Sequence, residues 1–202
     1  MSALLVTGTD TGVGKTFVAC ALAMALRARG LRVAVLKPVE TGVTDVPEDA
    51  RRLQAAAADP APLDDIVPYR LRAPLAPAVA AREEGVTIDL ERIAALVIRR
   101  TAGADVLLIE GAGGLLVPLV GTTTYAELAV QLALPLLLVA PNRLGTINHC
   151  ALTARVAAAA RIPIRAFVLS QPSPAIDPHA SAHRRLQLIE IPSPPPVSTV
   201  VS

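Results

Sequence analysis

A glycine-bearing segment near the N-terminus constrains the fold of this chain more than any other feature of its sequence. Residues 9–16 read Thr-Asp-Thr-Gly-Val-Gly-Lys-Thr and directly follow the apolar run at 4–6. A strand, a glycine-bearing turn and a helix in this order form a cradle of main-chain N–H groups for phosphate. The usual pattern is G-x-x-x-x-G-K-[ST], but Thr9 stands at its first position here and the glycine comes one residue earlier, at Gly8. The sequence therefore predicts a phosphate-binding loop with one departure from the usual pattern.

The loop contains groups suited to a nucleoside triphosphate. Lys15 brings a positive charge to the terminal phosphates, and the Thr16 hydroxyl can ligate Mg²⁺. Main-chain amides of the turn and of the helix start are expected to face the phosphates. The residues of this segment that we expect to contact the nucleotide are Gly12, Val13, Gly14, Lys15, Thr16 and Phe17.

Short apolar runs alternate with stretches of helical length along the first 170 residues. The runs are nearly continuous in Val, Leu and Ile, which is typical of strands buried on both faces. We expect strands at 3–7, 32–36, 105–109, 134–139 and 165–169, and helices at 15–29, 49–58, 90–101, 125–132 and 146–160. This order predicts an α/β fold of the P-loop NTPase-like kind, with a mainly parallel sheet and helices on both faces.

Two segments fall outside this alternation. Residues 60–85 contain five prolines and are predicted to form a long structured loop with one short helix, over the site or at an interface. The Pro- and Ser-rich residues 192–202 are expected to be weakly ordered. We expect residues 1–202 to form a single domain around one core.

Composition argues against several classes of partner. The net charge of +2 and an aromatic content of 2% give no basis for a nucleic-acid-binding surface. No stretch is long and apolar enough to span a bilayer, and the first apolar run is too short for a signal peptide. We therefore expect a cytoplasmic protein with neither nucleic acid nor membrane as a partner.

Polar residues follow the predicted strands where a parallel sheet binds its ligands. Lys37 follows the second strand, Glu110 the third and Ser170 the fifth. Glu110 is the best carboxylate to join Thr16 around Mg²⁺, although it could instead cap a following helix. Asp49 is a second candidate, or an ordinary acidic residue of a first helical turn. Lys37 is a candidate second cation for the γ-phosphate, or an edge lysine that guards the sheet.

Four motifs in this order resemble those of the dethiobiotin synthetase family. They are Gly-Thr-Asp-Thr-Gly-Val-Gly-Lys-Thr at 8–16, Lys-Pro-Val-Glu-Thr-Gly at 37–42, Glu-Gly-Ala-Gly-Gly at 110–114 and Leu-Gly-Thr-Ile-Asn-His at 144–149. The resemblance implies a homodimeric, ATP- and Mg²⁺-dependent carbon–nitrogen ligase of biotin biosynthesis. It implies that 7,8-diaminopelargonic acid captures CO₂ as a carbamate, that ATP activates the carbamate as a carbamic–phosphoric anhydride, and that the second amine closes the ureido ring.

The resemblance also implies roles for individual residues. Lys15 would neutralise the phosphates, Lys37 would bridge the carbamate and the γ-phosphate, and Thr11 would act beside them at the diamine. The implied Mg²⁺ ligands are Thr16, Asp49 and Glu110, and the implied nucleotide contacts outside the loop are Glu110, Gly113 and Ser170. The implied substrate contacts are Thr11, Lys37, Thr41, Gly111, Leu144, Gly145 and Asn148, the last three at a dimer interface. Many members have asparagine at the position of Ser170, where it reads adenine, so the serine implies looser base selection.

Two other classes of protein with related loops are rival interpretations. A partitioning or cell-division ATPase would signal to a partner without catalysing synthesis, but such proteins have a lysine where this chain has Asp10. An amidotransferase-type synthetase would need a glutaminase domain with a reactive cysteine, and neither Cys20 nor Cys150 lies in such a setting. The synthetase is the favoured hypothesis.

Overall fold

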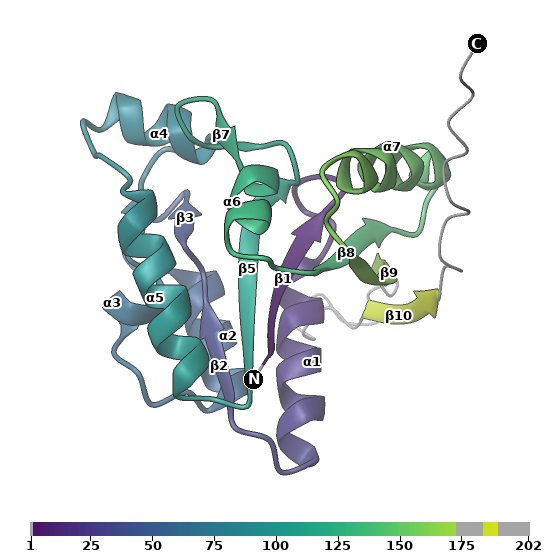
Figure 1. Cartoon of the computed structure of the whole chain (residues 1–202), viewed down its shortest axis with the longest axis horizontal. Coiled ribbons are helices and arrows are strands. Elements are labelled where there is room, and N and C mark those ends of the chain that lie inside the picture. The colour runs from purple at the N-terminus through teal and green to yellow at the C-terminus, as the bar shows by residue number, and fades with distance from the viewer. Residues whose placement is uncertain (1, 173–183, 190–202) are drawn as a thin grey trace.

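The computed structural model describes residues 2–172 and 184–189, and its centre is a six-stranded sheet with helices on both faces (Figure 1). The strand order is β10-β9-β8-β1-β5-β2, and the strands run parallel except for β10, which is antiparallel to β9. The strands are β1 (Ser2–Gly8), β2 (Val33–Leu36), β5 (Val106–Gly114), β8 (Leu136–Pro141), β9 (Ile164–Pro172) and β10 (Arg184–Ile189). The main helices are α1 (Lys15–Ala28), α2 (Glu48–Ala57), α5 (Leu90–Ala102), α6 (Tyr125–Gln131) and α7 (Thr146–Ala159).

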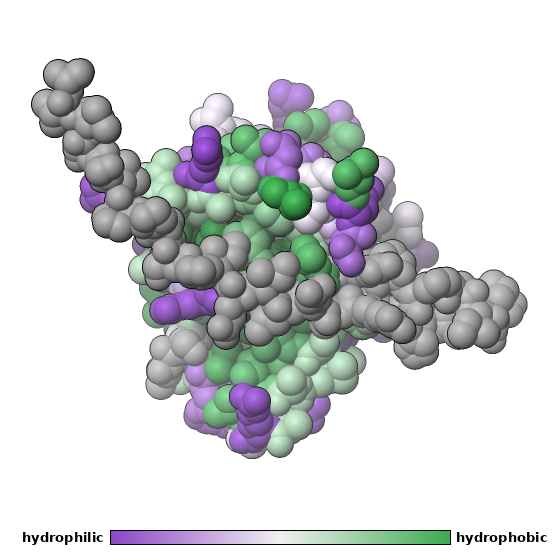
Figure 2. Space-filling view, turned by 90° about the vertical axis from the view of Figure 1, so that its right-hand side faces the viewer, coloured by the Kyte–Doolittle hydropathy of each residue, from purple (hydrophilic) through white to green (hydrophobic). Residues whose placement is uncertain are grey.

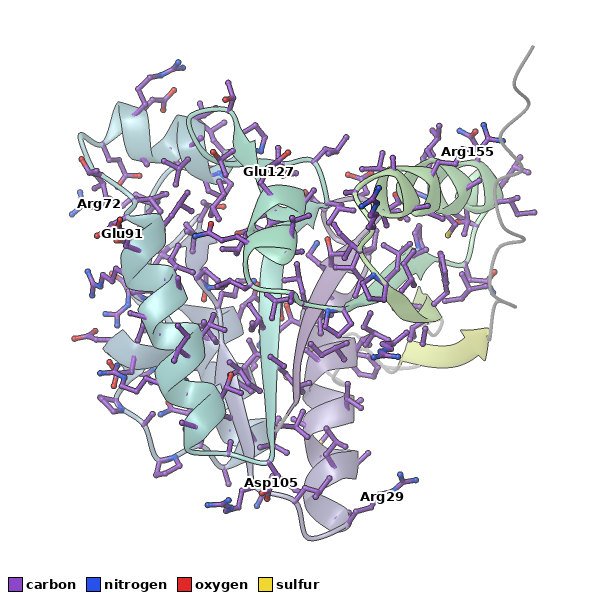
Figure 3. All side chains as sticks on the ribbon, in the orientation of Figure 1. Arg29, Arg72, Glu91, Asp105, Glu127 and Arg155 are labelled. Carbon is purple, nitrogen blue, oxygen red and sulfur yellow. The ribbon has the colours of Figure 1, made fainter. Side chains whose placement is uncertain are left out.

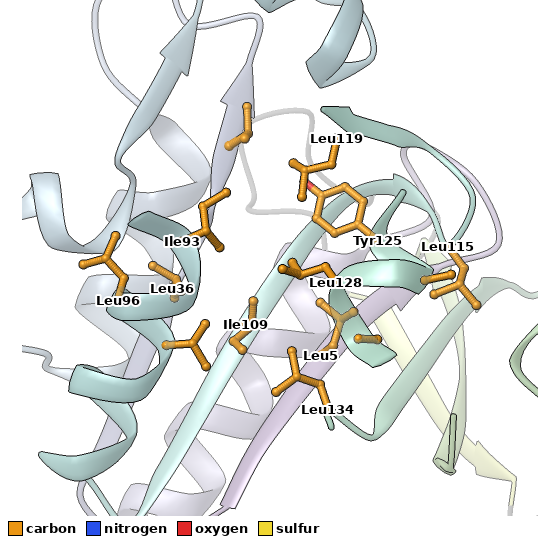
Figure 4. Close-up of a cluster of buried hydrophobic side chains, with 14 of the residues drawn as sticks. Leu5, Leu36, Ile93, Leu96, Ile109, Leu115, Leu119, Tyr125, Leu128 and Leu134 are labelled. Atoms are coloured by element: carbon orange, nitrogen blue, oxygen red, sulfur yellow. The ribbon is translucent and has the colours of Figure 1, made fainter. Parts of the chain in front are cut away.

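Side chains of the central strands alternate between two hydrophobic cores, one on each face of the sheet. Leu5 packs into the core that α5 and α6 cover, together with Ile93 and Tyr125 (Figure 4). The next residue, Val6, points to the opposite core, where α1 contributes Val18 and α2 contributes further apolar side chains. Both faces are thus covered, which explains why the strand sequences are continuously apolar.

The free edge of β2 is closed by a buried ion pair. Asp59 accepts a hydrogen bond from the Val35 N–H at 2.9 Å, and the Arg100 Nε donates to the Val35 carbonyl at 3.1 Å. The two side chains also pair with each other. They satisfy backbone groups that a further strand would otherwise bind, and each charge has its partner.

The predicted mainly parallel sheet and the five predicted pairs of strand and helix are confirmed, with bounds that shift by at most five residues. The largest shift is in β5, which continues through Glu110 to Gly114 although the glycines there read as a turn. The strand continues because glycine lets its backbone pass close to β1: a Cβ on Gly114 would lie 3.3 Å from the Gly8 carbonyl oxygen.

Residues 60–85 are more regular than their prolines suggested. They contain α3 (Leu63–Ile66), β4 (Tyr69–Leu71) and α4 (Pro77–Glu83), so the prediction of one short helix in a loop was wrong. Pro77 is the first residue of α4 and Pro62 precedes α3, so neither proline removes a hydrogen bond from within its helix. Strand β4 pairs in parallel with β3 (Val39–Thr41), and β6 (Pro118–Val120) pairs with β7 (Thr123–Thr124).

Two further observations bear on the sequence predictions. Among the described residues, no helix combines the length and the apolar character needed to cross a membrane. The predicted weakly ordered segment 192–202 lies outside the described residues.

Candidate active site

A cleft of about 1150 Å³ opens at the carboxyl ends of β1, β2 and β5, toward the upper part of Figure 1. It brings together most of the residues that the sequence predicted. Those lining it are Thr11, Gly12, Gly14, Lys15, Thr16, Phe17, Lys37, Thr41, Asp49, Glu110 and Gly113. Charged side chains such as Arg29 and Asp105 mark the opposite end of the molecule (Figure 3).

The phosphate-binding loop needs glycine at the unusual position 8. A Cβ there would lie 2.8 Å from the Asp10 carbonyl oxygen and 3.2 Å from the Lys15 Nζ. Gly12 and Gly14 have φ angles of 72° and 96°, a region that L side chains rarely adopt. The shifted glycine therefore keeps the loop tight against the Lys15 side chain.

Lys15 is held inside the loop that it is expected to serve. Its side chain is buried, and its Nζ donates to the Asp10 carbonyl at 3.0 Å. Burial, and to a smaller extent the nearby Lys37, lower the pKa of Lys15 to about 8 against the opposing effect of the Glu110 carboxylate. An anion bound in the loop would favour the charged form of this ammonium and raise its pKa.

A second cation, Lys37, lies between two carboxylates. Its Nζ is 2.5 Å from the Glu110 Oε1 and 2.8 Å from the Asp49 Oδ2. Burial acts to lower the pKa of Lys37, but the two carboxylates outweigh burial and hold it above its ordinary value. Lys37 is therefore charged, and it is not an edge lysine exposed to solvent.

The residues predicted to bind Mg²⁺ lie together around this lysine. The Thr16 hydroxyl donates to the Glu110 Oε1 at 2.9 Å. Burial raises the pKa of Asp49, but Lys37 and the Thr16 hydroxyl outweigh it and leave that pKa below its usual value. The other Glu110 oxygen, Oε2, is buried and accepts no hydrogen bond from the described residues.

This donor set fits Mg²⁺. The described part of the chain has no group of three or more His, Cys, Asp or Glu side chains placed to hold a metal ion. Mg²⁺ needs no such cage, because it keeps several waters and takes few protein ligands besides phosphate. One hydroxyl and two carboxylates are oxygen ligands of the kind that it prefers, and Oε2 of the Glu110 carboxylate accepts no hydrogen bond from the described residues.

Sequence reasoning missed part of the cleft wall. Glu40 lines the cleft, and its carboxylate is buried against the start of α2. Residues 74–77, from the segment that the sequence placed over the site or at an interface, form another part of the wall. Arg52 lines it too, one turn beyond Asp49 on α2.

The predicted carboxylate-binding residues lie apart from this cleft, at the start of α7. Gly145 has a φ of 93° and caps the helix, and Leu144 before it is fully exposed. Ile147 is 86% exposed. In Figure 2, which shows the side of the molecule where α7 lies, apolar surface is interspersed with polar side chains. An exposed ion pair at 4.0 Å between Arg143 and Asp10 connects this region to the phosphate-binding loop.

Three further predicted contacts lie outside the cleft lining. Ser170 is buried at the end of β9, and its carbonyl accepts the Asn142 N–H at 3.0 Å. Val13 packs into the core beneath the loop. Gly111 faces the Tyr125 ring, where a Cβ would lie 3.4 Å from the nearest ring carbon.

Comparison with known proteins identifies the family. A family model described as an AAA domain matches residues 2–198. ATP-dependent dethiobiotin synthetases of Anaeromyxobacter dehalogenans (strain 2CP-C) and Anaeromyxobacter sp. (strain Fw109-5) are each 49% identical to this chain, over 88% of it and 80% of the relative.

Two solved structures are similar at greater distance, and the first has a TM-score that shows the same fold. The kinase domain of the Escherichia coli tyrosine kinase ETK matches with a TM-score of 0.54 and 16% identity, over 82% of this chain and 66% of that one. A ParA family ATPase from Chlorobium tepidum TLS has a TM-score of 0.49 at 15% identity, over 85% and 73% of the two chains. At 15–16% identity, structural similarity shows the fold and says nothing of function. The relatives at 49% identity establish the family: the chain belongs to the dethiobiotin synthetase family.

Proposed function

We propose that this chain is the ATP-dependent ligase that closes the ureido ring of dethiobiotin from 7,8-diaminopelargonic acid and CO₂. The observation that carries the proposal is the buried group of Lys15, Lys37 and Glu110 at the open end of a phosphate-binding loop. Family membership supports the same reaction and disfavours a partitioning-type switch.

The chemistry needs no nucleophile from the protein. One substrate amine adds to CO₂ and loses a proton to give a carbamate. A carbamate oxygen then attacks the γ-phosphorus of ATP, and ADP leaves, which gives the carbamic–phosphoric anhydride. The second amine attacks the carbamate carbon, phosphate departs, and the ring closes. Carbamate formation places negative charge on the carbamate oxygens, and the two later steps concentrate it on phosphate oxygens, so fixed positive charges are what the protein must supply.

The two lysines have separate roles in this proposal. Lys15 holds the terminal phosphates from inside the loop, and Lys37 bridges the carbamate and the γ-phosphate. Their burial supports these roles, since an ammonium in a water-poor site interacts strongly with phosphate. Thr11 and Thr41, both in the cleft lining, orient the diamine end of the substrate.

Thr16, Asp49 and Glu110 would hold Mg²⁺. When bound, the ion supplies charge neutralisation on the β- and γ-phosphates. In the ligand-free chain the Lys37 ammonium neutralises Asp49 and Glu110. That arrangement supports the view that the two carboxylates are built to face a cation.

The substrate carboxylate is proposed to bind at the start of α7, at Leu144, Gly145 and Asn148, in a homodimer. The exposure of Leu144 and Ile147 supports a partner surface there, because large apolar side chains on a helix start are costly to leave in water. Gly111 is proposed as a further substrate contact. A single domain acting in the cytoplasm completes the proposal, and use of ATP supports that location.

The test is phosphate release from ATP with and without diaminopelargonate and bicarbonate, followed by mass spectrometry of the product. We expect release to require both substrates and [¹³C]bicarbonate to label dethiobiotin at one carbon. Release that is indifferent to both substrates but rises with a protein or nucleic-acid partner would contradict the proposal and favour the switch.

A further inference from the structure

Helix α2 receives its N-terminal cap from a different element. The residue before the helix, Pro47, makes no side-chain hydrogen bond to it. Glu40, on β3, supplies the missing acceptors: its Oε1 accepts the Asp49 N–H and its Oε2 accepts the Ala50 N–H, each at 3.0 Å. These are the amides that a local cap residue ordinarily satisfies.

The cap is strong for physical reasons. Both carboxylate oxygens are engaged, the acceptor is charged, and it lies at the positive end of the helix. Glu40 is only 6% exposed, so its position is fixed by packing as well as by the two hydrogen bonds. Lys37 and Asp49 are the charged neighbours that act on it, and the cation offsets part of the carboxylate's charge.

The residue whose amide Glu40 holds is itself a functional side chain. Asp49 presents its N–H to Glu40 and its carboxylate to Lys37, 2.8 Å away. Lys37 in turn contacts Glu110, and Glu110 accepts from Thr16. A shift of the first turn of α2 would therefore move Asp49 away from the other residues of the group.

We propose that Glu40 is a positioning residue, which fixes Asp49 against Lys37 and Thr16 by tying the first turn of α2 to β3. The inference rests on the proposed function for its consequence in catalysis, but its geometry does not. Among the described residues, Glu40 makes no hydrogen bond to the side chain of a proposed metal ligand. It acts through the backbone of α2.

The decisive comparison separates positioning from simple helix capping. Glu40→Ala removes both acceptors, and Glu40→Gln keeps one carbonyl oxygen. The double variant Glu40→Ala/Pro47→Asp restores a local cap without restoring the tie to β3. Glu48→Ala is the matched control, since it removes an exposed carboxylate from the same helical turn.

Two quantities decide the role of Glu40 in each variant: the Mg²⁺ dependence of ATP binding by calorimetry, and kcat for dethiobiotin formation. The thermal unfolding temperature is measured beside them and reports the helix cap alone. For Glu40→Ala we expect the Mg²⁺ concentration at half effect to rise about tenfold and kcat to fall roughly 10- to 100-fold. ATP affinity in EDTA should be unchanged, Glu40→Gln should be intermediate, and Glu48→Ala should match the wild type. The double variant should regain thermal stability but not Mg²⁺ dependence or kcat.

Full recovery of both quantities in the double variant would overturn the proposal and reduce Glu40 to a cap. Unchanged Mg²⁺ dependence in Glu40→Gln would overturn it too, and that variant guards against misfolding of Glu40→Ala. If the wild type makes no dethiobiotin, the proposed function fails, while the binding measurements still decide the role of Glu40.

Discussion

The two ends of the proposed substrate path are built differently. At the phosphate end, Lys37 lies within hydrogen-bond distance of both Asp49 and Glu110, and the Lys15 Nζ donates to the Asp10 carbonyl. At the α7 end, Leu144 and the neighbouring Ile147 present exposed apolar side chains to solvent. One end is preorganised within a single chain, whereas we propose that the other is completed by a partner subunit.

The difference follows from the chemistry at each end. Stabilising charge on a transferring phosphoryl group requires dipoles and charges that are fixed beforehand. Holding a carboxylate at the far end of a flexible substrate requires only a helix N-terminus and a surface that excludes water. Substitutions at the phosphate end should therefore reduce turnover, and substitutions at the α7 end should reduce assembly and substrate affinity.

The largest effect is expected for Lys15→Ala. Removing the charge that faces the terminal phosphates should reduce kcat/KM about 1,000-fold or more. Steady-state phosphate release measures this. Arg29→Ala, at the far end of the molecule (Figure 3), is the control and should behave as wild type. Wild-type rates for the lysine variant would refute the role of the loop.

Lys37→Ala should lower kcat about 100-fold and leave ATP affinity nearly unchanged, because the proposed contact forms fully only as the carbamate attacks. Calorimetry of ATP binding together with single-turnover kinetics separates the two quantities. A change in KM alone would show that Lys37 acts in substrate binding and not in the chemical step.

Ile147→Asp tests the α7 end. A charge on this exposed position should disrupt the proposed dimer and raise KM for the diamine roughly tenfold, with little effect on ATP binding. Light scattering reports the molar mass. Ile98→Asp, which changes an apolar side chain that is 67% exposed on α5, is the matched control. Equal molar masses and equal KM values for the two variants would argue against an interface at α7.

Base selection should be loose. Ser170 offers fewer hydrogen-bonding groups than the asparagine of many relatives, so kcat/KM for ATP, GTP and CTP should agree within about tenfold. Competition assays with the three nucleotides provide the comparison. A strong preference for ATP would show that other contacts read the base.

The smallest effect is expected at a local helix cap outside the cleft lining. Glu127 accepts from the Thr124 N–H at 2.8 Å in a capping box on α6, and hydrogen bonds with Thr124 lower its pKa. This carboxylate therefore stabilises the fold above its unfolded-state pKa, and the contribution disappears as pH falls through the lower folded-state pKa. Glu127→Gln should reduce the free energy of unfolding by on the order of 0.5 kcal/mol at pH 7 and by less at pH 3. Urea titration at the two pH values measures this, and turnover at pH 7 should not change.

Much of the fold could be predicted because strand and helix signals are local. The apolar runs and the loop at 9–16 predicted the sheet and the position of Lys15. Segment 60–85 could not be predicted, because its short elements gain their stability from tertiary contacts such as the pairing of β3 with β4.

The site was predicted where a residue's role depends on its place at a strand end, as for Lys37 and Glu110. Glu40 was missed because its role depends on a helix start nine residues away along the chain. Pro47, at the cap position of that helix, indicates that the local acceptor is missing. It does not indicate which residue replaces that acceptor.

The most direct test is a crystal structure of the protein with Mg²⁺, a non-hydrolysable ATP analogue and diaminopelargonate. We predict that the γ-phosphate contacts both the Lys15 and the Lys37 ammonium groups, with the diamine beside Thr11 and Thr41. Phosphates bound elsewhere, or the two ammonium groups turned away from the nucleotide, would contradict it.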